Sequence, residues 1–490
     1  MPDMTPRQPQ FRSLYWTDTV LDLAELLATL NLTEPLYIVG GAVRDAFLQK
    51  PVKDLDLATP TQSISIGRQI ANAANGDVFV LDDERSVARV LLDVTDPMTG
   101  EQSKLTLDIA AFRGADLEAD LYGRDFTVNA MAVDLLGDLS LLIDPLNGEK
   151  DATQKVIRRC SPQAIEEDPI RALRAIRQST QLGFKIEPQT VADMRIHGTK
   201  LIDTSMERIR DEFITLLALD RASIAIKVMD TLGYLSLILP QISELKDKPL
   251  PEPHVFTGWK QALVTVEKLL GLLVTISYRR DDSTAASFAY GMLAMQLDRF
   301  RTELNMHMDK SWANDRPHRA LLVLGCLLHR VNDSINVTGE VAESLRLSNP
   351  EKKQLVAMVR YFEDSQSVDY KDPLAQHRFW YKADELGIDA ILLGLADYLA
   401  TYGNLLDQDA WLIQIERALM MLFAFYEQYD TVVNPPLLVN GNDLMETLDL
   451  TGGPIIGDML TAIREGQVTG DISKPADAIA TAKQYLADNA

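Results

Sequence analysis

Two aspartates one residue apart, Asp54 and Asp56, follow a glycine-containing turn in the stretch YIVGGAVRDAFLQKPVKDLDLATP (37–60). In a β-strand, residues i and i+2 point to the same face, so these carboxylates would lie side by side while Leu55 and Leu57 face a core. Paired oxygen donors suit Mg²⁺, and two ions about 4 Å apart can bind both oxygens of an in-line phosphoryl displacement. The alternative is a strand with an acidic, solvated face.

The residues that precede this aspartate pair in the sequence indicate a site that binds a phosphate group. Gly40 and Gly41 lie between an expected strand and an expected helix, where backbone N–H groups can approach an anion and the helix dipole favours negative charge. Arg44, one turn into that helix, can bind the same anion through its planar guanidinium, although a tight turn with a surface arginine has the same pattern. Asp108, in LTLDIAAFR, alternates with apolar neighbours. The sequence therefore predicts a third catalytic carboxylate at Asp108.

The elements that must position these residues differ between the two ends of the chain. Strand-length apolar segments such as GDVFVLDDE, SVARVLLDV and KLTLDIAAF fill the first 145 residues, after an expected helix at 15–30. From Pro162 onward the apolar residues recur almost throughout at helical spacing, with Gly and Pro only at joints. The expected fold is α+β, with a short mixed β-sheet and helices in an N-terminal head, followed by a long all-α region.

Composition and net charge exclude several classes of protein. The 490 residues carry a net charge of −23, which argues against a protein that coats nucleic acid. Residues 151–210 are the exception, with eleven Lys and Arg against eight Asp and Glu, so a nucleic-acid partner is expected to bind there. Two cysteines, no secretion signal and no apolar run of membrane-spanning length predict a cytoplasmic enzyme with no membrane partner.

The motifs VGGAVRD and KDLDLAT resemble the signature of the class II nucleotidyltransferases of the polymerase β superfamily, which comprise tRNA nucleotidyltransferases and bacterial poly(A) polymerases. Four further blocks agree in order and spacing over about the first 220 residues: GRDFTVNAMA (123–132), DPLNGEKD (144–151), EDPIRALRAIRQSTQLGF (167–184) and SMERIRDEF (205–213). The resemblance implies template-independent addition of C and/or A to the 3′ end of tRNA, from CTP and ATP. It also implies Mg²⁺ as the cofactor, held by Asp54 and Asp56.

Residues Asp168 and Arg171 could select the incoming base. With Arg174 and Arg177 they form one stripe of an expected helix, and on their own they fit an ordinary charged helix start beginning at Glu167. A carboxylate acceptor beside a guanidinium donor can, however, pair with the amine and ring nitrogen of cytosine and adenine, and it rejects uracil and guanine. The resemblance implies this role for Asp168 and Arg171, with Arg174 and Arg177 near the base and phosphates.

Arg124 and Asp125 match the block that holds the ribose hydroxyls in the family. The family pattern has two arginines, and here Gly123 stands in the first place. The segment 144–151 is expected to be a hinge, because its Pro, Asn and Gly residues interrupt regular structure.

Two later segments, EPHVFTGWKQALVTVEKLL (252–270) and RALLVLGCLLHRVND (319–333), resemble an HD phosphohydrolase domain, whose metals are held by several histidines and an adjacent His-Asp pair. The pair here is His329-Arg330, and the helix expected to carry a histidine ligand reads WKQ. Because a guanidinium cannot bind a cation, the domain is expected to be degenerate.

Four domains are predicted: a catalytic head at 1–148, a base-selecting neck at 149–220, a degenerate HD-like body at 221–370 and a helical tail at 371–490 that contacts tRNA. Three alternatives remain from the sequence. One is a poly(A) polymerase, although the basic tail typical of such enzymes is absent. The others, from different classes, are an HD-type phosphohydrolase and an inactive RNA-binding protein.

Overall fold

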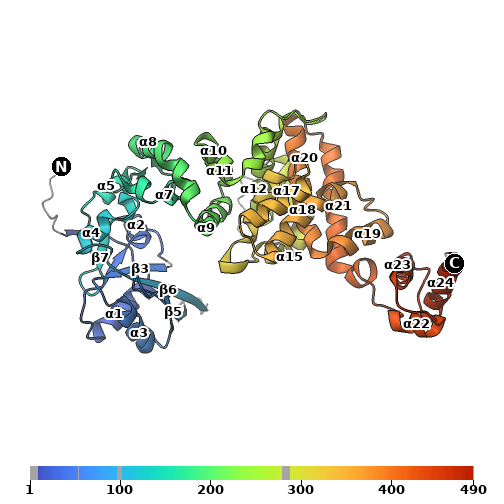
Figure 1. Ribbon diagram of the computed structural model, residues 1–490, viewed down its shortest axis with the longest axis horizontal. Helices are drawn as coiled ribbons and strands as arrows, with labels where there is room; N and C mark the ends of the chain where they lie inside the picture. The colour runs from blue at the N-terminus through green and yellow to red at the C-terminus, as the bar shows by residue number, and fades with distance from the viewer. Residues whose placement is uncertain (1–8, 53, 96–101, 279–286, 489–490) are drawn as a thin grey trace. The chain divides into compact units, whose positions relative to one another are not determined.

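The computed structural model describes residues 9–52, 54–95, 102–278 and 287–488. The chain divides into two compact units, Met1–Ser205 and Met206–Ala490 (Figure 1). The division falls inside the range 149–220 predicted as the neck, so most of that range shares a unit with the catalytic head.

The first unit is α+β, as predicted. Its elements are β1 (Gln10–Phe11), α1 (Asp18–Thr29), β2 (Tyr37–Val39), α2 (Gly41–Phe47), β3 (Asp54–Thr59), α3 (Ser63–Ala74), β4 (Asp77–Asp82), β5 (Val87–Thr95), β6 (Gln102–Ala111), α4 (Leu117–Tyr122), η1 (Thr127–Asn129), β7 (Ala132–Asp134), β8 (Leu141–Ile143), α5 (Gly148–Thr153), β9 (Val156–Ile157), α6 (Ala164–Glu167), α7 (Ile170–Leu182), β10 (Lys185–Ile186), α8 (Pro188–His197) and η2 (Gly198–Asp203).

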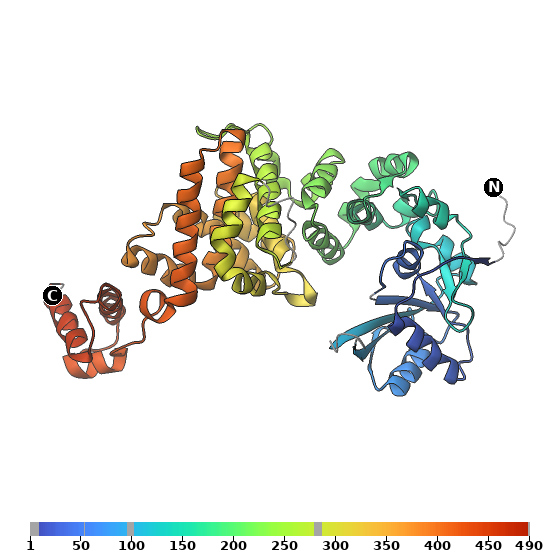
Figure 2. The same ribbon diagram turned by 180° about the vertical axis from the view of Figure 1, so that it is seen from behind.

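The main sheet has the strand order β1-β8-β7-β2-β3-β6-β5-β4. It is mixed, because β3 pairs antiparallel with β2 and parallel with β6. Apolar residues of one sheet face, among them Leu55 and Leu57, pack with α1 and α3 in the main core, and Figures 1 and 2 show both helices on this side. The alternation of β3 between exposed and buried residues therefore follows from a sheet that is covered by helices on one face.

The opposite face is covered only in part. Val39, Ala58 and Ala132 pack there against Leu121 of α4 and Ala130 after η1, in a small separate cluster. Beyond this cluster β3 carries Asp54 and Asp56, both exposed. The candidate carboxylates thus lie where the helical cover of this face ends.

One feature of the neck differs from the all-helical expectation. Strand β9 (Val156–Ile157) pairs in parallel with β10 (Lys185–Ile186) in a separate two-stranded sheet. Helix α7 lies between the two strands in the sequence. The helical periodicity of this region was dominated by α7 and α8, and two-residue strands are too short to produce a period-two pattern.

The second unit is helical throughout its described residues. Its elements are α9 (Met206–Leu217), α10 (Ala222–Thr231), α11 (Tyr234–Ile238), η3 (Pro240–Leu245), α12 (Gly258–Ile276), α14 (Phe288–Leu297), η4 (Asp298–Phe300), α15 (Arg301–Met308), η5 (Ala313–Asp315), α16 (His318–Leu328), α17 (Ser334–Ser344), α18 (Asn349–Ser367), α19 (Pro373–Ala383), η6 (Asp384–Leu386), α20 (Gly387–Tyr402), η7 (Gly403–Leu405), α21 (Gln408–Glu427), the π-helical turn η8 (Tyr429–Val433), α22 (Gly441–Leu448), α23 (Pro454–Thr469) and α24 (Pro475–Asp488).

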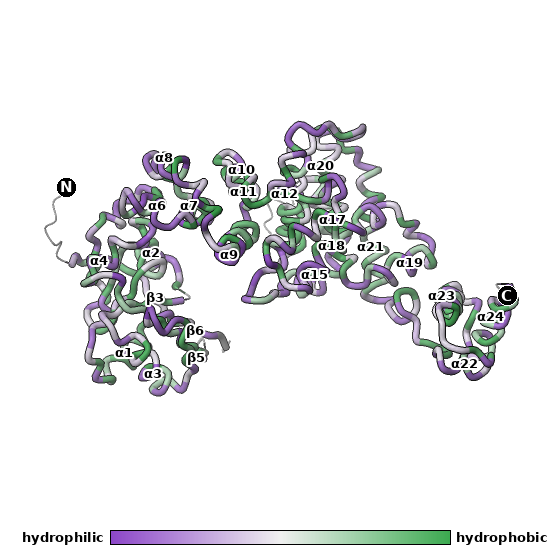
Figure 3. Tube along the Cα trace, in the orientation of Figure 1, coloured by the Kyte–Doolittle hydropathy of each residue, from purple (hydrophilic) through white to green (hydrophobic). Residues whose placement is uncertain are grey.

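Helix α20 lies at the centre of this unit and packs against α12, α16 and α18. Figure 3 shows hydrophobic segments running through these helices. By length and composition the segment Pro373–Leu405 could cross a membrane, yet 78% of its most apolar window is buried inside the unit, as in the core helix of a soluble protein. Helices α22 to α24 share a small core of their own.

Candidate active site

Three carboxylates share the open face of the sheet. Asp54 and Asp56 are two residues apart on β3, and Asp56 is directly in register with Asp108 on β6. Residues paired in register on neighbouring strands point to the same face, with their Cα atoms roughly 4.8 Å apart. The structure therefore brings together the three aspartates that the sequence singled out.

Arg89 extends this row by one strand and was not singled out from the sequence. It is in register with Asp108 and binds both oxygens of that carboxylate, with Nε–Oδ1 and Nη2–Oδ2 distances of 2.7 and 2.8 Å. Asp54 and Asp56 have no such cationic partner among the ion pairs of the described residues. The pair on β3 is thus the part of the row that is open to a metal ion.

The environment of Asp56 favours a cation. Its side chain is exposed, yet enough protein surrounds it for desolvation to be the largest cause of its raised pKa. The neighbouring charges of Asp108 and Asp54 raise the pKa further, whereas Arg124 and Arg174 oppose the rise. A bound cation would relieve this crowding of negative charge.

Gly40 lies against the same carboxylate. Its φ of +76° is in a region that side chains rarely adopt, and a Cβ there would lie 3.0 Å from Asp56 Oδ2 and 3.3 Å from Arg124 Nη1. The glycine turn before α2 therefore closely approaches the carboxylate pair and Arg124.

We expect Gly40→Ala to lower the rate of nucleotide addition by about 10²-fold, because the added methyl group displaces Asp56 or Arg124 by a fraction of an ångström to an ångström. Single-turnover extension of a tRNA primer measures this. Gly339→Ala is the control, since a Cβ at Gly339 of α17 meets atoms only at 3.8 Å or beyond. A Gly40→Ala protein with wild-type rate would contradict the placement of the site.

Arg44 belongs to a buried polar network in this structure. Its guanidinium donates to both oxygens of Asp45 at 2.9 Å and to Asn129 Oδ1 at 2.8 Å. Asn129 in turn donates to Asp125 Oδ1 at 3.0 Å, and Arg174 on α7 lies 2.8 Å from Asp125 Oδ2. The network thus links α2, the segment before η1 and the neck helix.

Asp125 is buried at the centre of this network. Burial tends to raise the pKa of its carboxyl, but Arg174 and the hydrogen bonds from Asn129 and the Phe126 N–H outweigh burial, so that the pKa is lowered. Arg124 points elsewhere: it donates to Asp120 at 3.1 and 3.2 Å, and its Nη1 faces Gly40. Of the two ribose candidates, Arg124 is the one beside the open carboxylates.

The expected placement of Asp168 on a helix was wrong. Helix α6 ends at Glu167, Asp168 is extended at φ −143° and ψ 91°, and α7 begins at Ile170. Pro169 explains the break, because a residue that precedes proline is disfavoured in the α region. Glu167 and Asp168 therefore do not share a helix with Arg171.

Arg171, Arg174 and Arg177 do lie on α7 at spacing three. Arg171 is buried, and its terminal nitrogens donate to the carbonyl of Gly123 at 2.7 Å and the carbonyl of Ala164 at 3.3 Å. A guanidinium carries five N–H groups, so these two bonds leave further donors. Gly123, where the family has an arginine, contacts Arg171 through its backbone.

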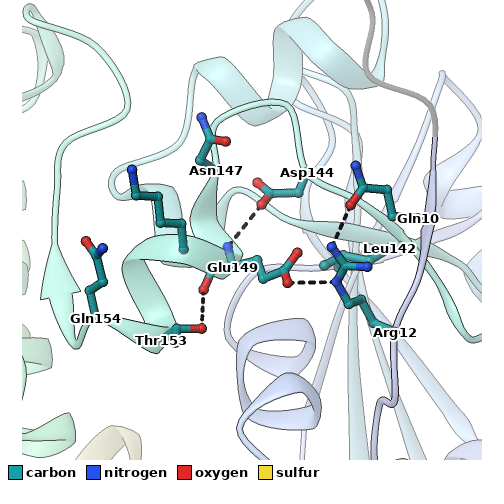
Figure 4. Close-up of a pocket in the computed structure, with 9 residues that line it drawn as sticks. Gln10, Arg12, Leu142, Asp144, Asn147, Glu149, Thr153 and Gln154 are labelled. Carbon is teal, nitrogen blue, oxygen red and sulfur yellow. Dashed lines mark hydrogen bonds and ion pairs between the residues drawn. The ribbon is translucent and has the colours of Figure 1, made fainter.

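The segment 144–151 is held in place by hydrogen bonds. Asp144 accepts from the N–H groups of Gly148 at 2.7 Å and Glu149 at 3.0 Å, at the start of α5. Figure 4 shows this turn at a pocket of about 350 Å³, where Arg12 Nε donates to Glu149 Oε1 at 2.7 Å. The pocket lies at the β1–β8 edge and contains none of the predicted site residues, so it is separate from the carboxylate row.

The residues that resemble an HD motif lie together in the second unit. His329 Nε2 lies 3.0 Å from Asp397 Oδ1, Gln261 donates to the same oxygen at 2.9 Å, and Arg330 pairs with Asp397 Oδ2. Asp397 on α20 was not singled out from the sequence. The guanidinium of Arg330 thus lies against the Asp397 carboxylate, and the degenerate HD-like domain stays a prediction.

Family profiles match three parts of the chain. The poly A polymerase head domain matches residues 36–158, the RNA and SrmB-binding site of polymerase A matches 183–246, and tRNA nucleotidyltransferase domain 2 matches 326–482. The first match contains the carboxylate row and Gly40.

Two curated relatives match almost the whole chain. An A-adding tRNA nucleotidyltransferase of Deinococcus radiodurans is 30% identical over 459 residues, covering 91% of this chain and 95% of the relative. A CC-adding tRNA nucleotidyltransferase of Geobacter sulfurreducens is 27% identical over 453 residues, covering 92% and 91%. The solved structure of a CCA-adding enzyme without ligand aligns with a TM-score of 0.61 at 22% identity, covering 96% of this chain and 94% of that one, so it shares the fold.

Proposed function

Because the chain belongs to the family of tRNA nucleotidyltransferases and poly(A) polymerases, we propose that it adds C or A to the 3′ end of tRNA without a template. The observation that supports the site is the row of Asp54, Asp56 and Asp108 on the open face of the sheet, beside Gly40. The relatives that are similar along the whole chain add either A or CC. We therefore propose that this enzyme also adds only one part of the CCA end. We further propose that it acts in the cytoplasm.

In the proposed reaction the terminal 3′-hydroxyl oxygen of tRNA attacks the α-phosphorus of CTP or ATP. A new P–O bond forms, the bond to the β-phosphate oxygen breaks, and pyrophosphate leaves. The family implies a divalent metal ion, and the oxygen donors of Asp54 and Asp56 fit Mg²⁺. Asp54 and Asp56 would hold Mg²⁺, which would supply a lowered pKa at the attacking hydroxyl and positive charge against the triphosphate.

The remaining predicted residues bind the nucleotide in this proposal. Gly40, Gly41 and Arg44 hold the triphosphate, which requires the Arg44 guanidinium to exchange its contact with Asp45 or Asn129 for a phosphate oxygen. Arg124 and Asp125 position the ribose.

Base selection is proposed for Asp168 and Arg171, with Arg174 and Arg177 beside them. The Gly123 carbonyl accepts a hydrogen bond from Arg171, and Asp168 lies in the extended connection between α6 and α7 rather than on a helix. A carboxylate acceptor and a guanidinium donor on neighbouring segments provide the pairing pattern shared by cytosine and adenine.

The test offers tRNA lacking CCA, tRNA ending in C and tRNA ending in CC to the enzyme with one nucleotide at a time and Mg²⁺. We expect one of two results: a single A added only to tRNA ending in CC, or C added only to the two shorter tRNAs. Completion of the whole CCA end would replace the proposal with a CCA-adding enzyme. Ladder-like extension of any RNA with ATP would indicate a poly(A) polymerase, and no extension under any condition would refute the activity.

A further inference from the structure

Helix α20 carries two buried carboxylates, Asp389 and Asp397, eight residues apart and so about 12 Å along the helix. Each faces a histidine at one end of α16. His318, the first residue of α16, lies within 3.0 Å of Asp389, and His329, just after its last residue, lies 3.0 Å from Asp397. The two histidine–aspartate contacts differ in what else surrounds the carboxylate.

Four helices meet at Asp389. His307 of α15 approaches Asp389 Oδ1 with Nε2 at 2.8 Å, and His318 Nε2 lies 3.0 Å from Oδ1 and 2.9 Å from Oδ2. The Gln354 amide of α18 contacts Oδ2. All four side chains are buried, and the ligand atoms of the two histidines and the aspartate lie within 4.8 Å of one another.

The charges at the two carboxylates are not alike. Asp397 has the permanent cation of Arg330. Among the described residues, Asp389 contacts only histidines and an amide, while the nearest lysine, Lys310, pairs with Glu385 on the far side of His307. With both imidazoles neutral, this carboxylate is buried without a cation, which is a costly arrangement unless a cation is bound.

We propose that His307, His318 and Asp389 hold one divalent transition-metal ion, for which zinc fits best. Two imidazole nitrogens and a carboxylate oxygen are a donor set that zinc favours in tetrahedral sites. The Gln354 amide can turn to present its oxygen as a fourth donor. This site is in the second unit, has nitrogen donors and shares no residue with the proposed Mg²⁺ ligands.

The groups around the cluster suit this role. His307 Nδ1, the ring nitrogen that faces away from Asp389, lies 3.3 Å from Lys310 Nζ and 3.5 Å from Glu385 Oε1. In the metal-bound form Nδ1–H would donate to Glu385, which leaves the Nε2 lone pair for the metal, while Lys310 keeps its pair with Glu385. The ion would join α15, α16 and α20, and with Gln354 also α18.

A proton on His307 is the competing source of positive charge. Burial lowers the pKa of His307, but Asp389 and Glu385 outweigh burial and raise that pKa to about 9, while Lys310 opposes the rise. A proton, however, lies between two atoms only. His318 is as close to the carboxylate as His307 is, and a metal ion can bind all three groups at once.

The experiment measures metal in the full-length protein, purified without added metal or chelator, by inductively coupled plasma mass spectrometry. We expect about one zinc per chain, retained in Asp54→Asn/Asp56→Asn and lost in His318→Ala. Removal of the ion with a strong chelator should lower the unfolding temperature of the wild type, and Zn²⁺ should restore it. His254→Ala is the control for a histidine outside the cluster.

Cobalt gives a second measurement that does not depend on a folded variant. Co²⁺ added to the chelator-treated wild type should produce the visible absorption of a tetrahedral site with nitrogen ligands. The proposal is overturned if the native protein contains no metal and the chelator-treated protein takes up neither Zn²⁺ nor Co²⁺. In that case the charge comes from a proton, and the unfolding temperature should instead fall as pH rises through about 9.

Discussion

Asp56→Asn is expected to slow nucleotide addition by about 10³-fold, because losing one ligand of the metal pair removes roughly 4 kcal/mol of transition-state stabilisation. Asn keeps the shape of the side chain but offers a neutral oxygen in place of a carboxylate. The measurement is the single-turnover rate of extension of a tRNA primer at saturating nucleotide and Mg²⁺. Asp77→Asn is the matched control, since Asp77 is an exposed aspartate of β4 in the same sheet.

The same variant should not be less stable than the wild type in the absence of Mg²⁺. The raised pKa of Asp56 means that the folded protein disfavours its ionised form, through desolvation and through Asp108 and Asp54, so a neutral residue removes an unfavourable charge. Its unfolding temperature should be equal or slightly higher, and the increase caused by Mg²⁺ in the wild type should disappear. A fall in stability would mean that Asp56 has a structural role, and an unchanged rate would mean that it is not a ligand of the catalytic metal.

Much of the head could be predicted because its signals are local. The alternation of β3 placed Asp54 and Asp56 on one face through the period of a strand alone, and the mixed sheet with a helical remainder was confirmed. The pairing of Asp56 with Asp108 needs a register between strands that lie about 50 residues apart in sequence, and no local pattern fixes that register.

The features of the structure that were not predicted from the sequence have physical causes of two kinds. The helix across Asp168 was a local error, since Pro169 was visible and the restriction on the preceding residue applied. The ion-pair partner of Asp108 could not be predicted from the sequence. Arg89 lies beside Asp108 only because β5 pairs antiparallel with β6. The role of Arg44 as a phosphate ligand stays a prediction, and the sequence held no sign that Asp45 and Asn129 would bind its guanidinium.

The HD-like residues were predicted from the sequence only in part. The His329-Arg330 pair could be recognised because its two residues are adjacent, whereas Asp397 is 67 residues further on in an apolar helix. In the structure Arg330 pairs with Asp397, so the buried carboxylate has a permanent cation beside it. The stability of the buried carboxylate therefore depends on this one side chain.

Arg330→Ala is accordingly expected to destabilise the second unit by about 3 kcal/mol, because it leaves the Asp397 carboxylate buried without its cation. Asp397 is 2% exposed and Arg330 21%, so little solvent screens the pair. For a unit of this size the unfolding temperature, measured by circular dichroism, should fall by about 5–10 °C.

Two further variants separate loss of charge balance from loss of packing. Arg330→Ala/Asp397→Asn should recover most of the lost stability, since the unpaired charge is gone while the stacking of Arg330 on Phe362 is still missing. Arg378→Ala, which breaks an exposed pair with Glu465, should change the unfolding temperature little. Nucleotide addition at 25 °C should persist in all three proteins, because the carboxylate row lies in the other unit. If Arg330→Ala instead kept full stability and lost activity, Arg330 would contact RNA rather than replace a metal ion.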